Sequence, residues 1–149
     1  MDEILSLRFD GCMATNIEQV YRHLEQVYER LISPLGLSVL EWYALRALYA
    51  EDGVTASHLA QTVCRHPSSM TALLDRMEEK DLLRRQVDEH DRRSVRVFLT
   101  DRGRTLEPQV LSVIARLETL LDESLTPEQL ETFQDVLCAL QNIDLPQIP

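Results

Sequence analysis

The sequence predicts a mainly α-helical fold that also carries a small antiparallel β element of two or three strands. Apolar residues recur at intervals of three and four along most of the chain, which is the period of an amphipathic helix. Only four glycines and six prolines occur among the 149 residues, which argues against a loop-rich or all-β fold. Residues 83–99 are the exception, because they contain two short strand-like runs around a charged turn. This length fits a single domain, residues 1–149, with a sizeable core.

Two helices are predicted in the first third of the chain. The first covers residues 14–33 and ends near Ser33, because Pro34 disfavours helical geometry at the residue before it. The second covers residues 37–50 and is apolar over much of its circumference, so most of it should be buried. Asp52 and Gly53 then form a turn. The apolar stripe of the first helix consists of Ile17, Val20, Tyr21, Leu24, Val27, Tyr28 and Leu31.

A short helix, a break and a second helix follow. Thr55 is the expected N-cap of the short helix, and Pro67 suits the first position of the second one. The second helix places small and polar residues opposite an apolar stripe, which allows close approach to a groove of nucleic acid. An ordinary pair of solvated helices fits the same pattern. The stripe consists of Met70, Leu73, Leu74 and Met77, and the short helix turns Leu59, Ala60 and Val63 inward.

A hairpin is predicted next, with strands at 83–87 and 95–99. Val95, Val97 and Leu99 alternate onto one face of the second strand. The turn between the strands contains aspartates, which tolerate tight backbone geometry, and Arg92 and Arg93 lie at its tip. Paired arginines at the end of a solvated hairpin can reach into a nucleic-acid groove, although an ordinary surface hairpin has the same features.

The last third is predicted to return to helix. Thr100 is the expected cap of a long helix that contains Pro108, which predicts a kink there. Thr126 should cap the final helix, with Pro127 at its first position and Gln129 completing a capping box.

Charge is distributed unevenly. The net charge of −10 is unusual for a protein that binds nucleic acid. Residues 58–104 nevertheless carry a net +2, while 1–57 carry −5 and 105–149 carry −7. We expect the acidic flanks to face away from any phosphate backbone. The positive residues of the middle third peak at Arg84, Arg85, Arg92, Arg93, Arg96, Arg102 and Arg104.

Several classes of protein are disfavoured. The N-terminus lacks the features of a signal peptide, and no apolar run reaches the roughly 20 residues that cross a bilayer, so we expect no membrane partner. Three scattered cysteines suggest neither a disulfide framework nor a metal site, which favours a cytoplasmic location. The sequence contains no catalytic motif that we recognise, so we expect no enzyme, no cofactor and no metal.

Helix, turn, helix and hairpin together make a winged helix-turn-helix, and the motifs resemble those of the MarR family of bacterial transcriptional regulators. The resemblance extends from about residue 14 to 142. It departs from the family at Asp81, where glycine is usual, and at His66 and Pro67, which start the recognition helix. Asp81 tolerates the left-handed conformation that ends a helix. The matching segments are 70–80, 82–85, Asp88, 91–95 and 99–103, and the most specific are Asp91 to Arg93 followed by Leu99, Thr100 and Gly103.

The resemblance implies a homodimer that binds double-stranded DNA. Residues 37–104 would form the DNA-binding region, and helices in 14–33 and 105–149 would interlock between subunits. Arg93 would enter the minor groove with Asp91 helping to orient it, Arg92 would contact the backbone, and Arg65 completes the expected DNA-binding set. The residues expected in the major groove are Ser68, Ser69, Thr71 and Arg76.

The expected function is that of a repressor released from a pseudo-palindromic operator by a small phenolic or aromatic effector. The effector would contact Tyr21, Tyr28, Trp42, Tyr43 and Arg46, although the same residues also suit a plain core.

Two alternatives remain. Cys12 precedes the first helix, near the reactive thiol of redox-sensing relatives, and would support a peroxide sensor. A winged helix can also act as a protein–protein interaction module that binds no DNA. We expect Cys64 and Cys138 to be inert core residues.

Overall fold

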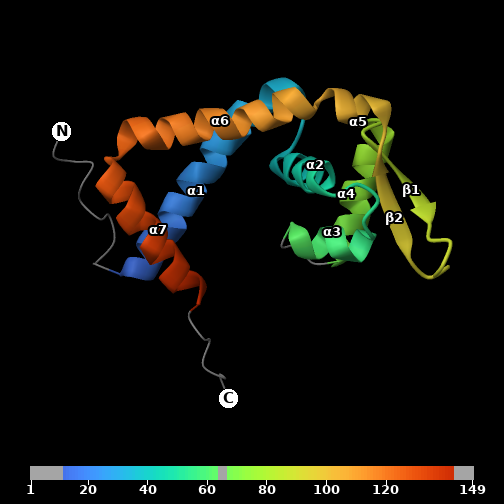
Figure 1. Ribbon diagram of the computed structural model, residues 1–149, viewed down its shortest axis with the longest axis horizontal. Helices are drawn as coiled ribbons and strands as arrows, with labels where there is room; N and C mark the ends of the chain where they lie inside the picture. The colour runs from blue at the N-terminus through green and yellow to red at the C-terminus, as the bar shows by residue number, and fades with distance from the viewer. Residues whose placement is uncertain (1–11, 64–66, 143–149) are drawn as a thin grey trace, which may run out of the picture. The chain divides into compact units, whose positions relative to one another are not determined.

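The structure, a computed structural model, describes residues 12–63 and 67–142. The chain divides into two compact units, Met1–Leu111 and Ser112–Pro149, which are described separately below. The elements labelled in Figure 1 follow the order α1 (Met13–Ile32), η1 (Ser33–Leu35), α2 (Val39–Ala50), α3 (Ala56–Thr62), α4 (Pro67–Glu79), β1 (Leu83–Val87), β2 (Val95–Leu99), α5 (Asp101–Thr105), α6 (Glu107–Ser124) and α7 (Pro127–Gln141).

Helices α2 and α3 of the first unit begin at side-chain caps. Ser38 and Glu41 form a reciprocal capping box, in which the Ser38 amide donates to Glu41 Oε2 at 2.7 Å. This cap starts α2 at Val39, two residues later than periodicity predicts. Thr55 caps α3 as predicted, since its hydroxyl oxygen accepts the His58 amide at 3.1 Å.

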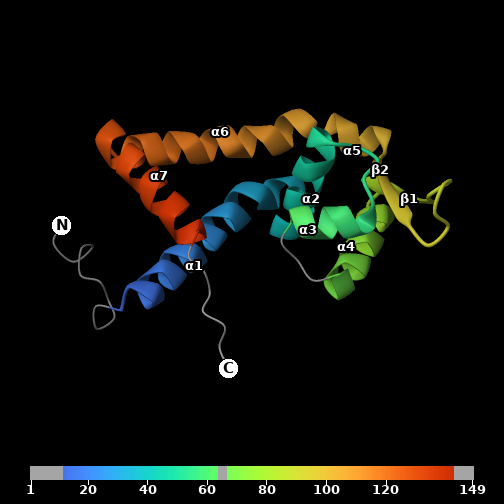
Figure 2. The ribbon, with the colours of Figure 1, turned by 60° about the horizontal axis from the view of Figure 1, so that its bottom comes forward.

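The recognition-helix candidate α4 ends at Glu79, and Asp81 just beyond it adopts the left-handed conformation predicted for it, with φ of 57°. The Leu82 amide reaches back to the Met77 carbonyl at 2.9 Å, so the end of the helix is satisfied. In Figures 1 and 2, α3 and α4 lie together and the hairpin follows α4.

The hairpin matches the predicted strands. β1 and β2 pair antiparallel, from Leu83 opposite Leu99 to Val87 opposite Val95. Beyond this two-stranded sheet, Thr55 and Arg96 form an isolated bridge. The segment before α3 therefore borders β2 and ties the hairpin to the helices.

One predicted helix proves to be two. Thr100 caps α5 by accepting the Gly103 amide at 3.1 Å, but α5 ends at Thr105 and α6 begins at Glu107. Pro108 lies in the first turn of α6, where its missing N–H costs little. The proline therefore falls after an interruption of the helix, rather than at a bend within one long helix.

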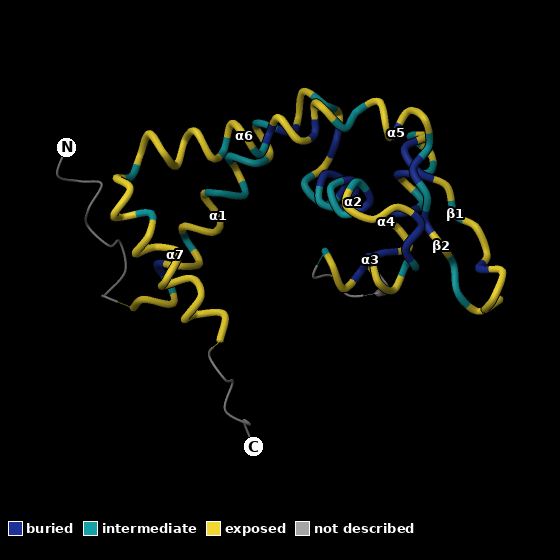
Figure 3. The backbone as a smooth tube through the Cα atoms, in the orientation of Figure 1, coloured by how far each residue is buried: buried dark blue, intermediate teal, exposed yellow. Residues whose placement is uncertain are grey.

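The core of the first unit lies among α2, α3, α4 and the hairpin, where Figure 3 shows most of the buried positions. The predicted stripe of α4 is buried as expected: Met70, Leu73, Leu74 and Met77 are each at most 3% exposed. The largest fully buried side chains of this unit include Trp42, Ile32, Leu45, Leu48, Leu59, Leu82, Leu83 and Val97.

The second unit contains the rest of α6 and α7. The predicted capping box of α7 is present, because Thr126 and Gln129 bond reciprocally at 2.8 and 3.3 Å. Phe133, Val136, Leu137 and Leu140 remain 39–48% exposed. No helix in the described part of the chain combines the length and apolarity needed to cross a membrane.

Candidate nucleic-acid interface

The exposed face of α4 carries several of the predicted DNA-contacting residues. Ser69, Thr71 and Arg76 are exposed, opposite the buried stripe that anchors the helix. Ser68 lies within α4. Arg65 lies outside the described residues, and so do Cys64 and His66. A helix held by one apolar face and presenting small polar groups on the other can approach a DNA groove closely.

Asp88 organises the turn of the hairpin. Its side chain is only 6% exposed, and its carboxylate accepts the amides of His90 at 2.8 Å and Asp91 at 3.3 Å. Arg96 Nε donates to the other carboxylate oxygen. These bonds, led by the His90 amide and followed by the Arg96 guanidinium, lower the pKa of Asp88.

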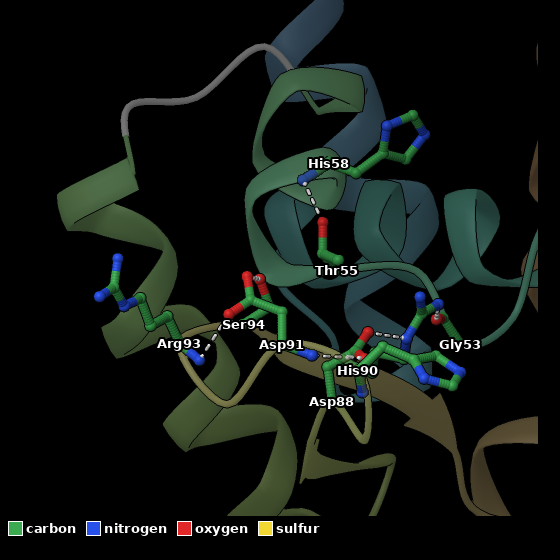
Figure 4. Close-up of polar contacts among 9 residues, drawn as sticks. Gly53, Thr55, His58, Asp88, His90, Asp91, Arg93 and Ser94 are labelled. Atoms are coloured by element: carbon green, nitrogen blue, oxygen red, sulfur yellow. Dashed lines mark hydrogen bonds and ion pairs between the residues drawn. The ribbon is translucent and has the colours of Figure 1, made fainter.

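Asp91 shapes the tip itself (Figure 4). Its carboxylate accepts the Arg93 amide at 3.0 Å and the Ser94 hydroxyl at 2.9 Å. The Arg93 guanidinium points away from this carboxylate, and both Arg92 and Arg93 are exposed. Asp91 thus bonds the loop backbone next to Arg93 rather than the guanidinium, which leaves that charge available to a partner.

The hairpin is also fastened to the turn before α3. Arg96 Nη1 donates to the Gly53 carbonyl at 2.8 Å. The Val97 amide donates to the Val54 carbonyl at 2.9 Å, and the Val97 carbonyl accepts the Gly53 amide at 3.0 Å. Asp52 accepts the Leu99 amide at 2.8 Å and pairs with Arg104 at 2.7 Å. In the protein alone, these bonds therefore hold the base of the loop that carries Arg92 and Arg93.

Sequence reasoning missed these supporting residues. Asp88 was assigned only a turn role, and Arg96 only a share of the positive charge. The alternation of β2 could have given one signal, since Arg96 lies on the opposite face from Val95 and Val97. Its partners, Asp88 and Gly53, are 8 and 43 residues away, and that pairing is not readable from spacing.

The aromatic residues predicted to contact an effector are largely brought together. Tyr28 and Tyr43 lie 5.7 and 5.1 Å from the Trp42 ring, measured between centroids, and the Arg46 guanidinium lies 4.6 Å over that ring. Trp42 is fully buried and donates to the Val110 carbonyl at 2.9 Å. Burial raises the pKa of Tyr43. Tyr21 is 54% exposed.

The structure contradicts one of the predictions made for the cysteines. Cys12 is exposed at the N-cap of α1, and the neighbouring Thr15 hydroxyl and amide lower the pKa of its thiol. Cys138 is exposed, so its assignment to an inert core is wrong. Apolar residues recur along α7 at the spacing of a buried helix face, but Phe133, Val136, Leu137 and Leu140 are exposed there. Within residues 12–63 and 67–142, no cluster of three or more His, Cys, Asp or Glu could hold a metal.

Comparison with known proteins gives a consistent result. The model described as "MarR family" matches residues 35–94. The chain is 29% identical over 133 residues to the HTH-type transcriptional regulator YsmB of Bacillus subtilis (strain 168), covering 85% of this chain and 90% of that one.

Two solved structures share the fold. A MarR transcriptional regulator from Methanosarcina mazei Go1 aligns with a TM-score of 0.75 and 26% identity, covering 87% of this chain and 94% of the other. The transcriptional repressor CouR, bound to a 23-mer DNA duplex, aligns with a TM-score of 0.80 and 23% identity, covering 87% and 92%.

Proposed function

Because the chain belongs to the MarR family of transcriptional regulators, we propose that it acts as a homodimeric repressor that binds a pseudo-palindromic DNA operator. The observation that carries this proposal is the exposed, arginine-tipped hairpin, which is hydrogen-bonded at its base and lies beside an exposed polar helix face. A helix of this kind suits the major groove and an arginine suits the narrow minor groove. The repressor CouR, which shares the fold, is itself bound to DNA.

The contacts divide by role. The major groove is contacted or bordered by five residues: Arg65, Ser68, Ser69, Thr71 and Arg76. Arg93 enters the minor groove and Arg92 contacts phosphate. Asp91 supports the Arg93 contact through the loop, since its carboxylate accepts the Arg93 amide and the Ser94 hydroxyl. The net +2 of residues 58–104 gives this region an attraction for phosphate that the rest of the chain lacks.

Dimerisation is supported by apolar side chains on the terminal helices. Met13, Ile17 and Val20 on α1 are 44–65% exposed, and α7 exposes Phe133, Val136, Leu137 and Leu140. Apolar faces of this kind are covered in a stable protein. A second copy would cover them and present two recognition helices to half-sites about one helical turn apart.

A small aromatic effector is the release signal in this proposal. Tyr28, Tyr43 and Arg46 are partly exposed beside the buried Trp42 ring, so a ring could stack there and a carboxylate could pair with Arg46. Release requires that the effector favour one spacing of the two recognition helices.

Mobility shift tests the DNA-binding proposal. The wild-type protein is first used to select duplexes from a randomised library, and binding to a selected duplex and to a scrambled one is then compared over a salt series. We expect tighter binding to the selected duplex and a linear fall of log affinity with log salt. Absence of any shift at low salt would instead support a protein–protein interaction module.

A second candidate is redox control through Cys12, which its exposure and lowered pKa favour. Mass spectrometry after peroxide treatment, with DNA binding measured in parallel, tests it. Oxidation of Cys12 should release DNA, and Cys12→Ser should abolish that response while Cys138→Ser keeps it. Full oxidation of Cys12 with unchanged DNA binding would exclude this mode of control.

A further inference from the structure

Arg85 of the wing strand β1 joins the two elements that would read DNA. Its Nε and Nη2 donate to Glu78 Oε2 at 2.9 and 2.6 Å, and its backbone amide donates to Glu78 Oε1 at 3.0 Å. The same Nη2 lies 2.6 Å from Asp75 Oδ1. Both carboxylates belong to α4, so one residue of the hairpin is bonded to two positions of the recognition helix, which are one turn apart.

The geometry of this group resists rotation. The guanidinium and the backbone amide together engage both oxygens of the Glu78 carboxylate, so the strand is fixed in direction as well as in distance. The Arg85 side chain is 30% exposed, which places it between the two elements rather than out in solvent. The hydrogen bond from the Arg85 amide is the largest cause of the lowered pKa of Glu78, and the Glu78 carboxylate in turn raises the pKa of Arg85.

The group also lies where electrostatics matter for the proposed complex. One DNA strand separates the major groove from the minor groove, so its phosphates pass between a helix in the first and a wing in the second. Asp75 and Glu78 lie on the part of α4 that faces the wing, and unpaired carboxylates there would repel those phosphates. Arg85 pairs with both carboxylates and offsets one of their two negative charges, while it fixes the spacing of the two reading elements.

We propose that Arg85 is a positioning residue for sequence-specific DNA binding, acting through Glu78 and Asp75 to hold the recognition helix and the wing in one fixed arrangement. This inference rests on the proposed function. Reading both grooves at once requires that Arg76 and Arg93 reach their targets together, and a fixed spacing removes the entropic cost of finding that arrangement on the DNA.

The chain supplies a matched control for each partner. Arg84 carries the same charge on the adjacent position of β1, where it is exposed, and Glu79 is the exposed neighbour of Glu78 on α4. Arg85→Ala and Arg84→Ala each remove one positive charge, and Glu78→Ala and Glu79→Ala each remove one negative charge. Only the first member of each pair removes bonds between helix and wing.

The readout is the ratio of affinities for a duplex selected by the wild-type protein and for a scrambled duplex of the same length. We expect Arg85→Ala to lower this ratio about tenfold, which is typical for residues that share one salt-bridge network, and Arg84→Ala to leave it unchanged. Glu78→Ala should bind the scrambled duplex at least as tightly as wild type but show a lower ratio, unlike Glu79→Ala. The double variant Arg85→Ala/Glu78→Ala should match Arg85→Ala alone.

A loss of folded protein would lower both affinities in proportion and leave the ratio intact, so circular dichroism melts accompany each variant. Equal ratios for Arg85→Ala and Arg84→Ala, with DNA binding by the wild type, would overturn the positioning role alone. Failure of the wild type to bind any duplex would overturn the proposed function and this role with it.

A second experiment needs no DNA. The chemical shift of the Arg85 amide proton in NMR spectra should follow the titration of Glu78, and a shift that does not change with that titration would contradict the bond on which the inference depends.

Discussion

At the scale of single residues, the hairpin shows which structural features sequence patterns predict and which they do not. Two strand-like runs predicted both strands with their observed bounds, with alternation supporting the second, and the paired arginines were predicted at the exposed tip. The burial of Asp88 and its pairing with Arg96 were not predictable, because a turn aspartate has the same sequence signature whether its carboxylate faces solvent or bonds the loop. Three-dimensional neighbours, rather than residue type, decide that role.

Arg93 should contribute directly to operator affinity. Arg93→Ala is expected to weaken operator binding by about 1–3 kcal/mol and to reduce the salt slope by about one unit, because an arginine in the minor groove contacts bases and displaces counterions. Fluorescence anisotropy over a salt series measures both. Arg102→Ala, which removes an exposed arginine from α5, is the matched control. Equal losses in the two variants would exclude a specific contact of Arg93.

Asp88 should make the order of the wing depend on pH. A carboxyl whose pKa is lower in the folded chain adds stability above its ordinary pKa, and this stability is lost as the pH falls through the lowered value. We therefore expect the amides of His90 and Asp91 to lose protection from hydrogen exchange only at pH values below the ordinary aspartate pKa of about 3.9. NMR of the wild type and of Asp88→Asn tests this. In the variant, protection should already be reduced at neutral pH, and an unchanged wing there would refute the account.

At the scale of elements, periodicity and capping residues predicted the order and type of the helices. Thr55 and Thr126 started their helices where expected. The break between α5 and α6 was predicted only as a kink, because a proline in sequence does not reveal whether the helix bends or stops. The contacts of Arg85 with α4 were not visible either, since they join strand and helix through side chains whose directions depend on packing.

Gly103 in α5 should tolerate no side chain. A Cβ atom added there would collide with the backbone carbonyl oxygen of Leu82, which cannot move freely because it also accepts the Thr100 amide at 3.2 Å. Gly103→Ala is expected to lower the free energy of unfolding by about 3 kcal/mol. Gly36→Ala, which meets open space at φ of 68°, should cost only about 1 kcal/mol. Urea denaturation measures both, and similar losses would contradict the close approach of α5 to Leu82.

At the scale of the whole molecule, apolar periodicity and composition predicted the fold class and the family motifs predicted the function class. The exposure of the apolar faces of α1 and α7, by contrast, became visible only with the structure. Periodicity alone shows that a helix has an apolar stripe. It does not show whether the same chain covers that stripe. For Cys138 this difference produced a wrong prediction of burial.

A charge on the apolar face of α7 should therefore disrupt the dimer. Val136 is 48% exposed, and Val136→Asp is expected to give monomers in analytical ultracentrifugation. Loss of the second DNA-binding half should weaken operator binding about a hundredfold. Val87→Asp adds the same charge at a 62% exposed site on the wing and should leave the sedimentation unchanged. A dimer that survives Val136→Asp would show that the subunits associate elsewhere.

The burial of Trp42 has a practical consequence for experiments on this protein. It is the only tryptophan in the chain, it is fully enclosed, and its indole N–H is bonded to the Val110 carbonyl. Its intrinsic fluorescence thus comes from one known location, close to Tyr28, Tyr43 and Arg46. The protein carries its own optical reporter there, and a change in emission on adding a small molecule can be read without any attached dye.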